Sequence, residues 1–301
     1  MSMLDQMAIA SLPLVPRPIM RKLSARYIAG ERVEDAIAKL EELRAAGFAG
    51  ILDLLGEDVV DEAQAREVVA TYRDAAELVA ARKLDAYISV KPTHVGLRVS
   101  AELALALYDE LARFLAGLGL FLRVEMEDHT TTDATLRMFE SLRASHENVG
   151  IVLQSRLFRT PDDIAASPDG PLNVRMVKGI YLEPAEIAHV DPEPIRSAYV
   201  DAVDTLFARG AFVSLATHDE EVARRCFALC EKHGVGKDRY ELQVLLGVRA
   251  PLWREWREAG HPVRVYVPYG PEWRAYSQRR LRKNPQIFRH VLKDMLGLNK
   301  S

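Results

Sequence analysis

The chain has 301 residues, of which 49% are hydrophobic and 28% are charged, as in an ordinary globular protein. A formal net charge of -3 gives no overall attraction to nucleic acid or to an anionic membrane. The apolar stretch near the N-terminus is interrupted by prolines at 13, 16 and 18 and follows no basic segment. We therefore expect neither a membrane span nor a signal peptide.

Two cysteines, Cys226 and Cys230, lie four residues apart in a segment with helical spacing. We interpret them as two small helix side chains, because the spacing fits neither a redox pair nor a zinc site. A chain without a disulfide framework suits a reducing compartment, so we expect a cytoplasmic location.

Eight short runs rich in β-forming residues alternate with longer segments along the chain. Most of the runs are continuously apolar, which is typical of strands buried in a parallel sheet. The predicted strands are residues 50–57, 86–93, 120–128, 149–155, 174–182, 212–219, 241–247 and 263–269.

The segments between these runs have apolar residues at three- and four-residue spacing, which predicts helices. We expect a threonine at 130–132 to cap the helix that begins at residue 133. The predicted helices are residues 36–46, 61–83, 101–116, 133–144, 161–166, 194–208, 220–233, 252–259, 272–282 and 286–296.

This alternation predicts a single α/β domain folded as a (βα)8 TIM-like barrel, with extra N-terminal helices and a substrate-binding C-terminal helix. Residues 1–46 would form a helical segment packed on the barrel, and residues 47–301 the catalytic barrel. An open doubly wound sheet is the alternative. It is disfavoured because no G-x-G-x-x-G follows any predicted strand.

Polar residues follow the apolar part of every predicted strand. The chemistry of a β/α barrel lies at the C-terminal ends of its strands, so these residues would converge on one rim. They are Glu57, Lys91, Thr93, Glu125, Glu127, Asp128, Gln154, Lys178, Tyr181, Thr217, His218, Asp219, Gln243, Tyr266 and Tyr269.

Individual residues on this rim have simpler explanations. Lys91 and Lys178 are either functional groups or solvated charges at strand ends. His218 alone is more often a hydrogen-bonded structural histidine than a ligand. No other residue completes a metal site beside it, so we predict no metal.

The last strand and helix carry three residues that can share a helix face, Tyr276, Arg279 and Arg280. Two guanidinium groups beside a phenol suit a bidentate grip on a carboxylate. A basic helix surface is the alternative interpretation of the same residues.

Motifs in a fixed order show that the chain resembles the proline dehydrogenase family, flavoenzymes that oxidise L-proline to Δ1-pyrroline-5-carboxylate. The resemblance covers roughly residues 50–285. The motifs are DLLGE at 53–57, SVKPT at 89–93, RVEMED at 123–128, VLQS at 152–155, VRMVKGIYLEP at 174–184, ATHD at 216–219, ELQVLLG at 241–247, and RVYVPYG with WRAYSQRRL between 264 and 281.

The resemblance implies an FAD cofactor lying across the strand ends. Arg175 would lie near the reactive edge of the flavin ring, where positive charge stabilises the reduced anion. The residues that the resemblance assigns to the cofactor are Met126, Gln154, Arg175, Lys178, Gly179, Ile180, Thr217 and His218.

The resemblance also implies a proline site, in which Lys91, Arg279 and Arg280 bind the carboxylate. Tyr266 and Tyr276 would pack on the ring, and Glu57 would form a gating ion pair with Arg279. Glu125 stands where aspartate is common and would be catalytic with Arg175, orienting Lys91 or the substrate. Ile180 replaces a commonly smaller residue.

The implied reaction is hydride transfer from C5 of a neutral proline to N5 of the flavin, the first step of proline catabolism to glutamate. Electrons would pass to a quinone, with transient peripheral contact at the inner face of the cell membrane. A pyrroline-5-carboxylate dehydrogenase would act downstream.

Two other functions suit the same barrel. A lyase or aldolase would use Lys91 or Lys178 as a Schiff-base nucleophile beside a carboxylate. A non-catalytic binding barrel would hold no chromophore and turn over no substrate.

Overall fold

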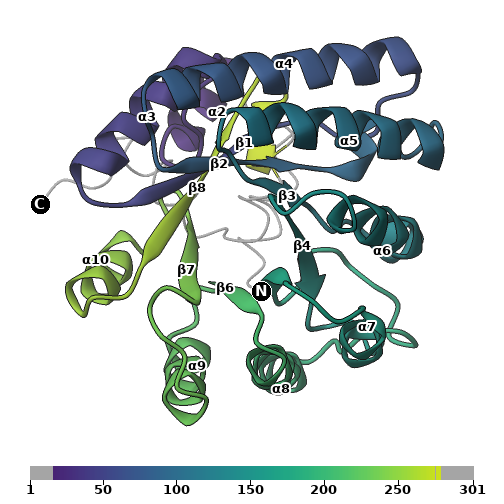
Figure 1. Cartoon of the computed structure of the whole chain (residues 1–301). Helices are drawn as coiled ribbons and strands as arrows, with labels where there is room; N and C mark the ends of the chain where they lie inside the picture. Colours follow the sequence, from purple (N-terminus) through teal and green to yellow (C-terminus); the bar gives the residue numbers. More distant parts are fainter. Residues whose placement is uncertain (1–15, 275, 279–301) are drawn as a thin grey trace, which may run out of the picture.

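A computed structural model describes residues 16–274 and 276–278, and it contains a closed barrel of eight parallel strands (Figure 1). Each strand pairs with the next along the chain, and β8 pairs with β1. The predicted (βα)8 barrel is confirmed, and an open sheet is excluded. The strands are β1 (Ala49–Leu54), β2 (Ala86–Val90), β3 (Leu122–Val124), β4 (Val149–Gln154), β5 (Asn173–Val177), β6 (Phe212–Ala216), β7 (Tyr240–Leu245) and β8 (Val263–Tyr269).

Helices surround the barrel on its outer side (Figure 1). Residues that point outward from the strands, such as Leu52 and Val265, join the apolar faces of these helices in one buried core. The surrounding helices are α4 (Glu62–Ala81), α5 (Ala101–Gly117), α6 (His129–Arg143), α7 (Thr160–Ala166), α8 (Pro192–Ala208), α9 (Glu220–Lys232) and α10 (Ala250–Glu258), and a short 3-10 helix, η2 (Pro92–Val95), follows β2.

The inner side of the barrel is polar at several levels. Arg123 is fully buried and donates to the carbonyl oxygens of Ile151 at 3.0 Å and Asn173 at 2.9 Å. Arg264 pairs with Glu241 at 2.8 Å in the same interior. The hydrogen bonds of Arg123 and the ion pair of Arg264 offset part of the cost of removing these charges from water.

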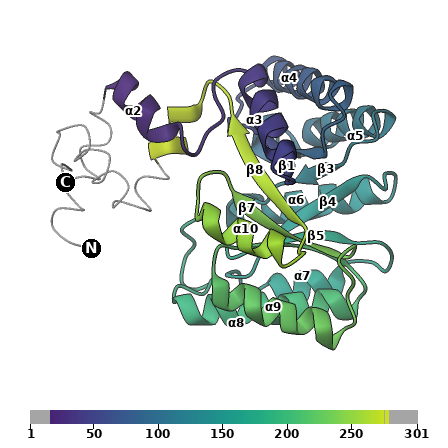
Figure 2. The ribbon, with the colours of Figure 1, turned by 90° about the vertical axis from the view of Figure 1, so that its left-hand side faces the viewer.

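Two further helices precede the barrel, α2 (Arg17–Ser24) and α3 (Val33–Ala45), and α3 packs against β1 and β8. Figure 2 shows α2 beyond the C-terminal end of β8, beside the segment that follows this strand. Gly270 N–H donates to the carbonyl of Gly30 at 3.0 Å, and the indole of Trp273 donates to Glu31 at 3.0 Å. These bonds hold the segment between α2 and α3 against the residues that follow β8.

Element boundaries differ from the sequence predictions at the C-terminal ends of the strands. The strands predicted at 120–128 and 174–182 end at Val124 and Val177, because the following residues leave the sheet. The prediction of a threonine cap for α6 is wrong. Asp128 caps this helix by accepting the Thr130 N–H at 2.9 Å, so the helix starts at His129.

The predicted helix at 272–282 is helical from residue 273 to 278 where it is described. Its remainder and the helix predicted at 286–296 lie outside the described residues. Among the described helices, none has the length and apolar character needed to span a bilayer.

Candidate active site

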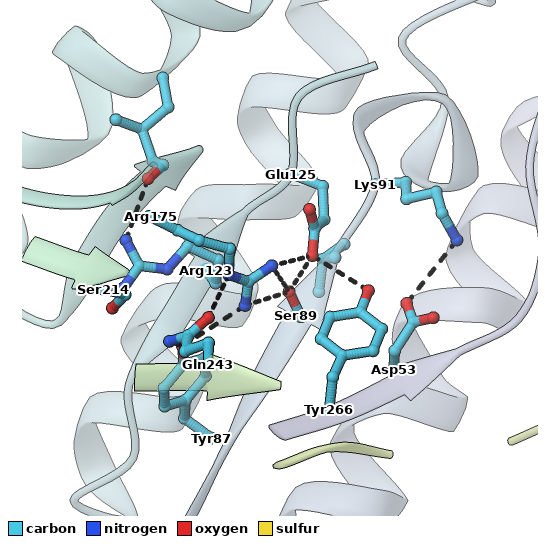
Figure 3. Close-up of polar contacts among 12 residues, drawn as sticks. Asp53, Tyr87, Ser89, Lys91, Arg123, Glu125, Arg175, Ser214, Gln243 and Tyr266 are labelled. Carbon is cyan, nitrogen blue, oxygen red and sulfur yellow. Dashed lines mark hydrogen bonds and ion pairs between the residues drawn. The ribbon is translucent and has the colours of Figure 1, made fainter. Parts of the chain in front are cut away.

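Arg175 of β5 lies at the centre of a polar network inside the barrel mouth (Figure 3). Its Nε donates to Gln243 Oε1 at 2.5 Å, and its two terminal nitrogens approach Ser89 Oγ at 3.4 and 3.3 Å. Nη1 also pairs with Glu125, whose carboxylate accepts a hydrogen bond from Ser89. Residues of β2 and β7 and the residue that follows β3 therefore fix the plane of one guanidinium group.

Arg175 and Glu125 form a buried ion pair that stays ionised. Burial would lower the pKa of the guanidinium, but Glu125, Tyr87 and Tyr266 together outweigh burial and the pKa is raised. Burial likewise opposes ionisation of Glu125, yet Arg175 and the hydrogen bond from Ser89 bring its pKa below the usual 4.5. The mouth therefore holds a guanidinium and a carboxylate that are both charged and fixed in place.

Tyr266 of β8 completes this network from the side. Its hydroxyl donates to Glu125 Oε1 at 3.0 Å, and its ring lies under the Arg175 guanidinium, 5.2 Å from centroid to Cζ. Tyr276 is close enough to influence the pKa of Tyr266. The structure thus brings together four predicted site residues, Arg175, Glu125, Tyr266 and Tyr276.

Lys91 lies beside this network at the end of β2 (Figure 3). Its Nζ is 3.6 Å from Asp53 Oδ1 and 4.0 Å from Glu57, and it donates to the carbonyl of Gly56 at 3.4 Å. Burial would lower the pKa of this ammonium, but the nearby acids, Asp53, Glu57, Glu125 and Glu127, together outweigh burial and raise it. A lysine held protonated is unsuited to the Schiff-base role, and it can bind an anion.

Asp53 is a site residue that the sequence analysis missed. It is 1% exposed, and burial raises its pKa to about 6 in spite of the nearby Lys91. Its Oδ1 accepts no hydrogen bond from the described residues. The available signal was an aspartate inside the otherwise apolar strand AGILDL, at the alternate position that faces inward.

An open cleft of about 510 Å³ lies beside the barrel mouth, over the ends of β5 and β6. Asp219 accepts from Lys178 Nζ at 2.6 Å and from Arg196 Nε at 2.7 Å, and these cations hold its pKa well below the usual value although burial opposes them. The cleft is lined by Lys178, Arg196, Ala216, Thr217, His218, Asp219 and Arg249. Its three cations suit a ligand that carries phosphate groups.

Arg196 and Arg249 were also missed by the sequence analysis, since both lie in helices or loops away from the strand-end motifs. Arg249 Nη1 donates to the carbonyl of His218 at 2.8 Å. His218 Nε2 accepts the backbone N–H of Leu245 at 3.0 Å, so this histidine has a structural hydrogen bond as well as a place on the cleft wall.

Gly179 brings the backbone of the β5–α8 loop close to the mouth. Its φ of 98° belongs to the left-handed region, and a Cβ would lie 2.6 Å from Arg156 Cδ and 2.9 Å from Gln154 Oε1. Gln154 is buried and donates to the Glu127 carbonyl at 2.8 Å. Only glycine fits this approach without displacing a neighbour.

The other predicted site residues are placed as follows. Met126 is buried after β3, whereas Ile180 is 55% exposed on the β5–α8 loop. Arg279 and Arg280 lie outside the described residues. Across the described ranges, no group of three or more His, Cys, Asp or Glu side chains could hold a metal ion.

Comparison with known proteins gives a family match over residues 36–290, to the family described as proline dehydrogenase. The chain belongs to the proline dehydrogenase family. The resemblance inferred from the ordered motifs is therefore confirmed.

Two named relatives agree with this family assignment. Proline dehydrogenase of Deinococcus radiodurans is 36% identical over 285 residues, which is 93% of this chain and 92% of that protein. Proline dehydrogenase 1 of Bacillus subtilis subsp. natto is 30% identical over 271 residues, which is 90% of this chain and 90% of that protein. The chain thus spans nearly the whole length of these members of the proline dehydrogenase family.

One solved structure supports the fold. The crystal structure of proline utilization A (PutA) from Bdellovibrio bacteriovorus inactivated by N-propargylglycine has a TM-score of 0.81 and 21% identity. The match covers 93% of this chain and 34% of that chain, so this chain spans about a third of its length. At this identity the likeness supports the barrel alone.

Proposed function

We propose that this member of the proline dehydrogenase family is an FAD-dependent enzyme that oxidises L-proline to Δ1-pyrroline-5-carboxylate, the first step of proline catabolism to glutamate. The observation that carries the proposal is the fixed Arg175–Glu125 pair, which lies near the protonated Lys91, together with the cationic cleft over the ends of β5 and β6. A carboxylate substrate and a phosphate-bearing cofactor would thus meet at one mouth.

The residues of this chain fit FAD on chemical grounds. Lys178, Arg196 and Arg249 supply positive charge along the cleft for the two phosphates. Gly179 leaves space next to Gln154, and Arg175 places a buried charge where a flavin ring would accumulate negative charge. We assign Met126, Ile180, Thr217 and His218 to the same cofactor site. When bound, FAD supplies the two-electron oxidant that accepts a hydride from the proline ring.

Lys91, Arg279 and Arg280 would bind the substrate carboxylate, with Tyr266 and Tyr276 packing on the ring. The charge balance supports this division. Lys91 and Arg175 are each paired with a buried acid, so they alone add little net charge. Two further arginines would add positive charge to the site, which favours the neutral amine over the ammonium form that cannot release a hydride.

Glu57 lies on the loop after β1, near Lys91, and we propose that it forms the gating ion pair with Arg279. Residues 1–46 would act as a helical segment packed on a catalytic barrel of residues 47–301. We further propose that a quinone accepts the electrons at the inner face of the cell membrane, and that a pyrroline-5-carboxylate dehydrogenase consumes the product.

Absorbance spectroscopy tests the central proposal. The purified protein should show a flavin band that bleaches when L-proline is added without oxygen. A colourless protein that also fails to take up FAD would refute the proposal.

A second experiment tests the carboxylate site. Arg279→Met and Arg280→Met should each raise KM for L-proline by roughly 10- to 150-fold, the equivalent of one lost charged hydrogen bond, while flavin stays bound. An unchanged KM in both variants would exclude the clamp.

A further inference from the structure

The loop between β1 and α4 places Glu57 next to Lys91, and its following corner rests on Thr93. Asp58 N–H donates to Thr93 Oγ1 at 3.1 Å, and Val59 N–H donates to the Thr93 carbonyl at 3.2 Å. Asp58 has a φ of 51°, a backbone conformation that needs support from its surroundings. Thr93 gives that support at Asp58, the residue that directly follows Glu57.

Thr93 is itself fixed by Glu127. The backbone N–H of Thr93 donates to Glu127 Oε2 and its hydroxyl donates to Oε1, both at 2.8 Å. A threonine hydroxyl can donate one hydrogen bond, and Thr93 donates it to Glu127. The lone pairs of the hydroxyl oxygen therefore remain to accept a hydrogen bond from Asp58 N–H. Glu127 therefore sets the direction in which Thr93 can accept a hydrogen bond.

Glu127 is well placed to act as this anchor because it is buried and held at its backbone. It is 4% exposed, and its carbonyl accepts the Gln154 side chain at 2.8 Å. Thr93 is 1% exposed, so neither partner can exchange its bonds for water. The contacts join the loop after β1 to the ends of β2, β3 and β4.

The other end of the same loop also rests on the segment that contains Thr93. Lys91 lies two residues before Thr93, and its Nζ donates to the Gly56 carbonyl at 3.4 Å. The His94 ring occupies the space beside Gly56, where a Cβ would lie 2.1 Å from Nε2. Residues on both sides of Glu57 are thus held by residues 91–94.

We infer that Thr93 and Glu127 are positioning residues, which hold the loop so that Glu57 stays beside Lys91 at the substrate carboxylate. This inference rests on the proposed proline site. Neither residue needs to touch the substrate, and both lie apart from the cationic cleft that we assign to the cofactor phosphates. Their effect should therefore fall on proline affinity rather than on flavin retention.

The test compares Thr93→Val, Thr93→Ser and Glu127→Gln with a matched control, Thr135→Val. Thr135 is fully buried in α6, and its hydroxyl has no hydrogen-bond partner in the described structure. This control removes the same hydroxyl group without removing a hydrogen bond to the loop.

We expect Thr93→Val and Glu127→Gln each to raise KM for L-proline about five- to tenfold, with kcat within twofold of wild type and flavin content unchanged. Thr93→Ser should restore KM, because it returns the hydroxyl without the methyl group. The double variant should be no worse than the single ones, since both break one chain of bonds.

The inference would be overturned by a KM within twofold of wild type in Thr93→Val, or by a serine variant no better than the valine variant. Parallel loss of flavin and proline affinity would also overturn it, because that indicates general unfolding of the mouth.

Hydrogen exchange separates this inference from the proposed function. Bleaching of the wild-type flavin by L-proline tests the function, whereas exchange at the Asp58 amide tests the hydrogen bond from Asp58 to Thr93 without any substrate. Thr93→Val should speed that exchange at least tenfold relative to Thr135→Val. Equal exchange rates at the Asp58 amide in the two variants would show that Thr93 does not hold the loop, even in an active enzyme.

Discussion

Replacing Glu125 by glutamine is the sharpest test of the buried network. The change keeps the size of the side chain but removes the charge that pairs with Arg175. Arg175 would keep its contacts with Gln243 and Ser89, which are neutral groups. The variant therefore isolates the cost of an unpaired guanidinium inside the barrel.

The magnitude follows from burial. Arg175 and Glu125 have side-chain exposures of 4% and 13%, so solvent screens the lost charge only weakly. Removing one partner of a buried pair costs about 3–5 kcal/mol of unfolding free energy. At about 2 °C per kcal/mol for a chain of this length, Tm should fall by roughly 6–10 °C.

The effect should depend on pH in a defined direction. Because the folded protein lowers the pKa of Glu125 below 4.5, the ion pair contributes its full stability above that pH. The contribution is lost as pH falls through the lowered pKa. The difference in Tm between wild type and Glu125→Gln should thus be constant from about pH 6 to 8 and shrink below about pH 4.5.

Thermal unfolding of both proteins, each with measured flavin content, would provide the comparison. A double variant that also carries Arg175→Met should recover part of the loss, with a coupling energy of at least about 2 kcal/mol. A Tm for Glu125→Gln within about 2 °C of wild type, or additive effects in the double variant, would show that Glu125 does not offset the cost of burying the Arg175 charge.

Three further results are expected. Gly179→Ala should lower flavin retention, because its Cβ would lie 2.6 Å from Arg156 in a left-handed backbone; unchanged retention would contradict the close approach. Gly50→Ala should cost about 1–3 kcal/mol in chemical denaturation, because its Cβ would lie 2.1 Å from a Leu40 methyl group of α3. Gly117→Ala, with open space around it, is the control for both and should be neutral or slightly stabilising. Burial raises the pKa of the Cys226 thiol to about 12. At pH 8 the alkylation of Cys226 in the native protein should therefore be at least about 100-fold slower than in urea. Equal alkylation rates would exclude the buried position.

The sequence predicted the barrel well because its strands are buried on both sides. Runs such as AYISV and VGIVLQ are short, apolar and β-rich, and they occur at barrel spacing. Strand ends were predicted less well, because hydrophobicity continues after the hydrogen bonds of the sheet stop. Asp128 illustrates the limit: it was grouped with the rim acids, yet it caps α6.

For the site, the sequence indicated the residues that close each strand but not the partners that lie deeper or further along the chain. Asp53 was hidden inside an apolar strand, and only the inward direction of its side chain relates it to Lys91. Arg196 reaches Asp219 from a neighbouring helix, across 23 residues of sequence. Such pairings depend on the three-dimensional register of the barrel, which spacing along the chain does not encode.

The ionic interior of the barrel has a consequence for the temperature dependence of stability. Unfolding exposes Arg123, Glu241 and Arg264 from positions that aliphatic side chains fill in many barrels. Exposure of polar surface lowers the heat capacity of unfolding, whereas exposure of apolar surface raises it. These three side chains should therefore make the heat capacity change of unfolding slightly smaller than it would be with aliphatic side chains at the same positions. A smaller change gives a slightly flatter stability curve, so the protein should lose slightly less stability on cooling from its optimum than a barrel with an aliphatic interior.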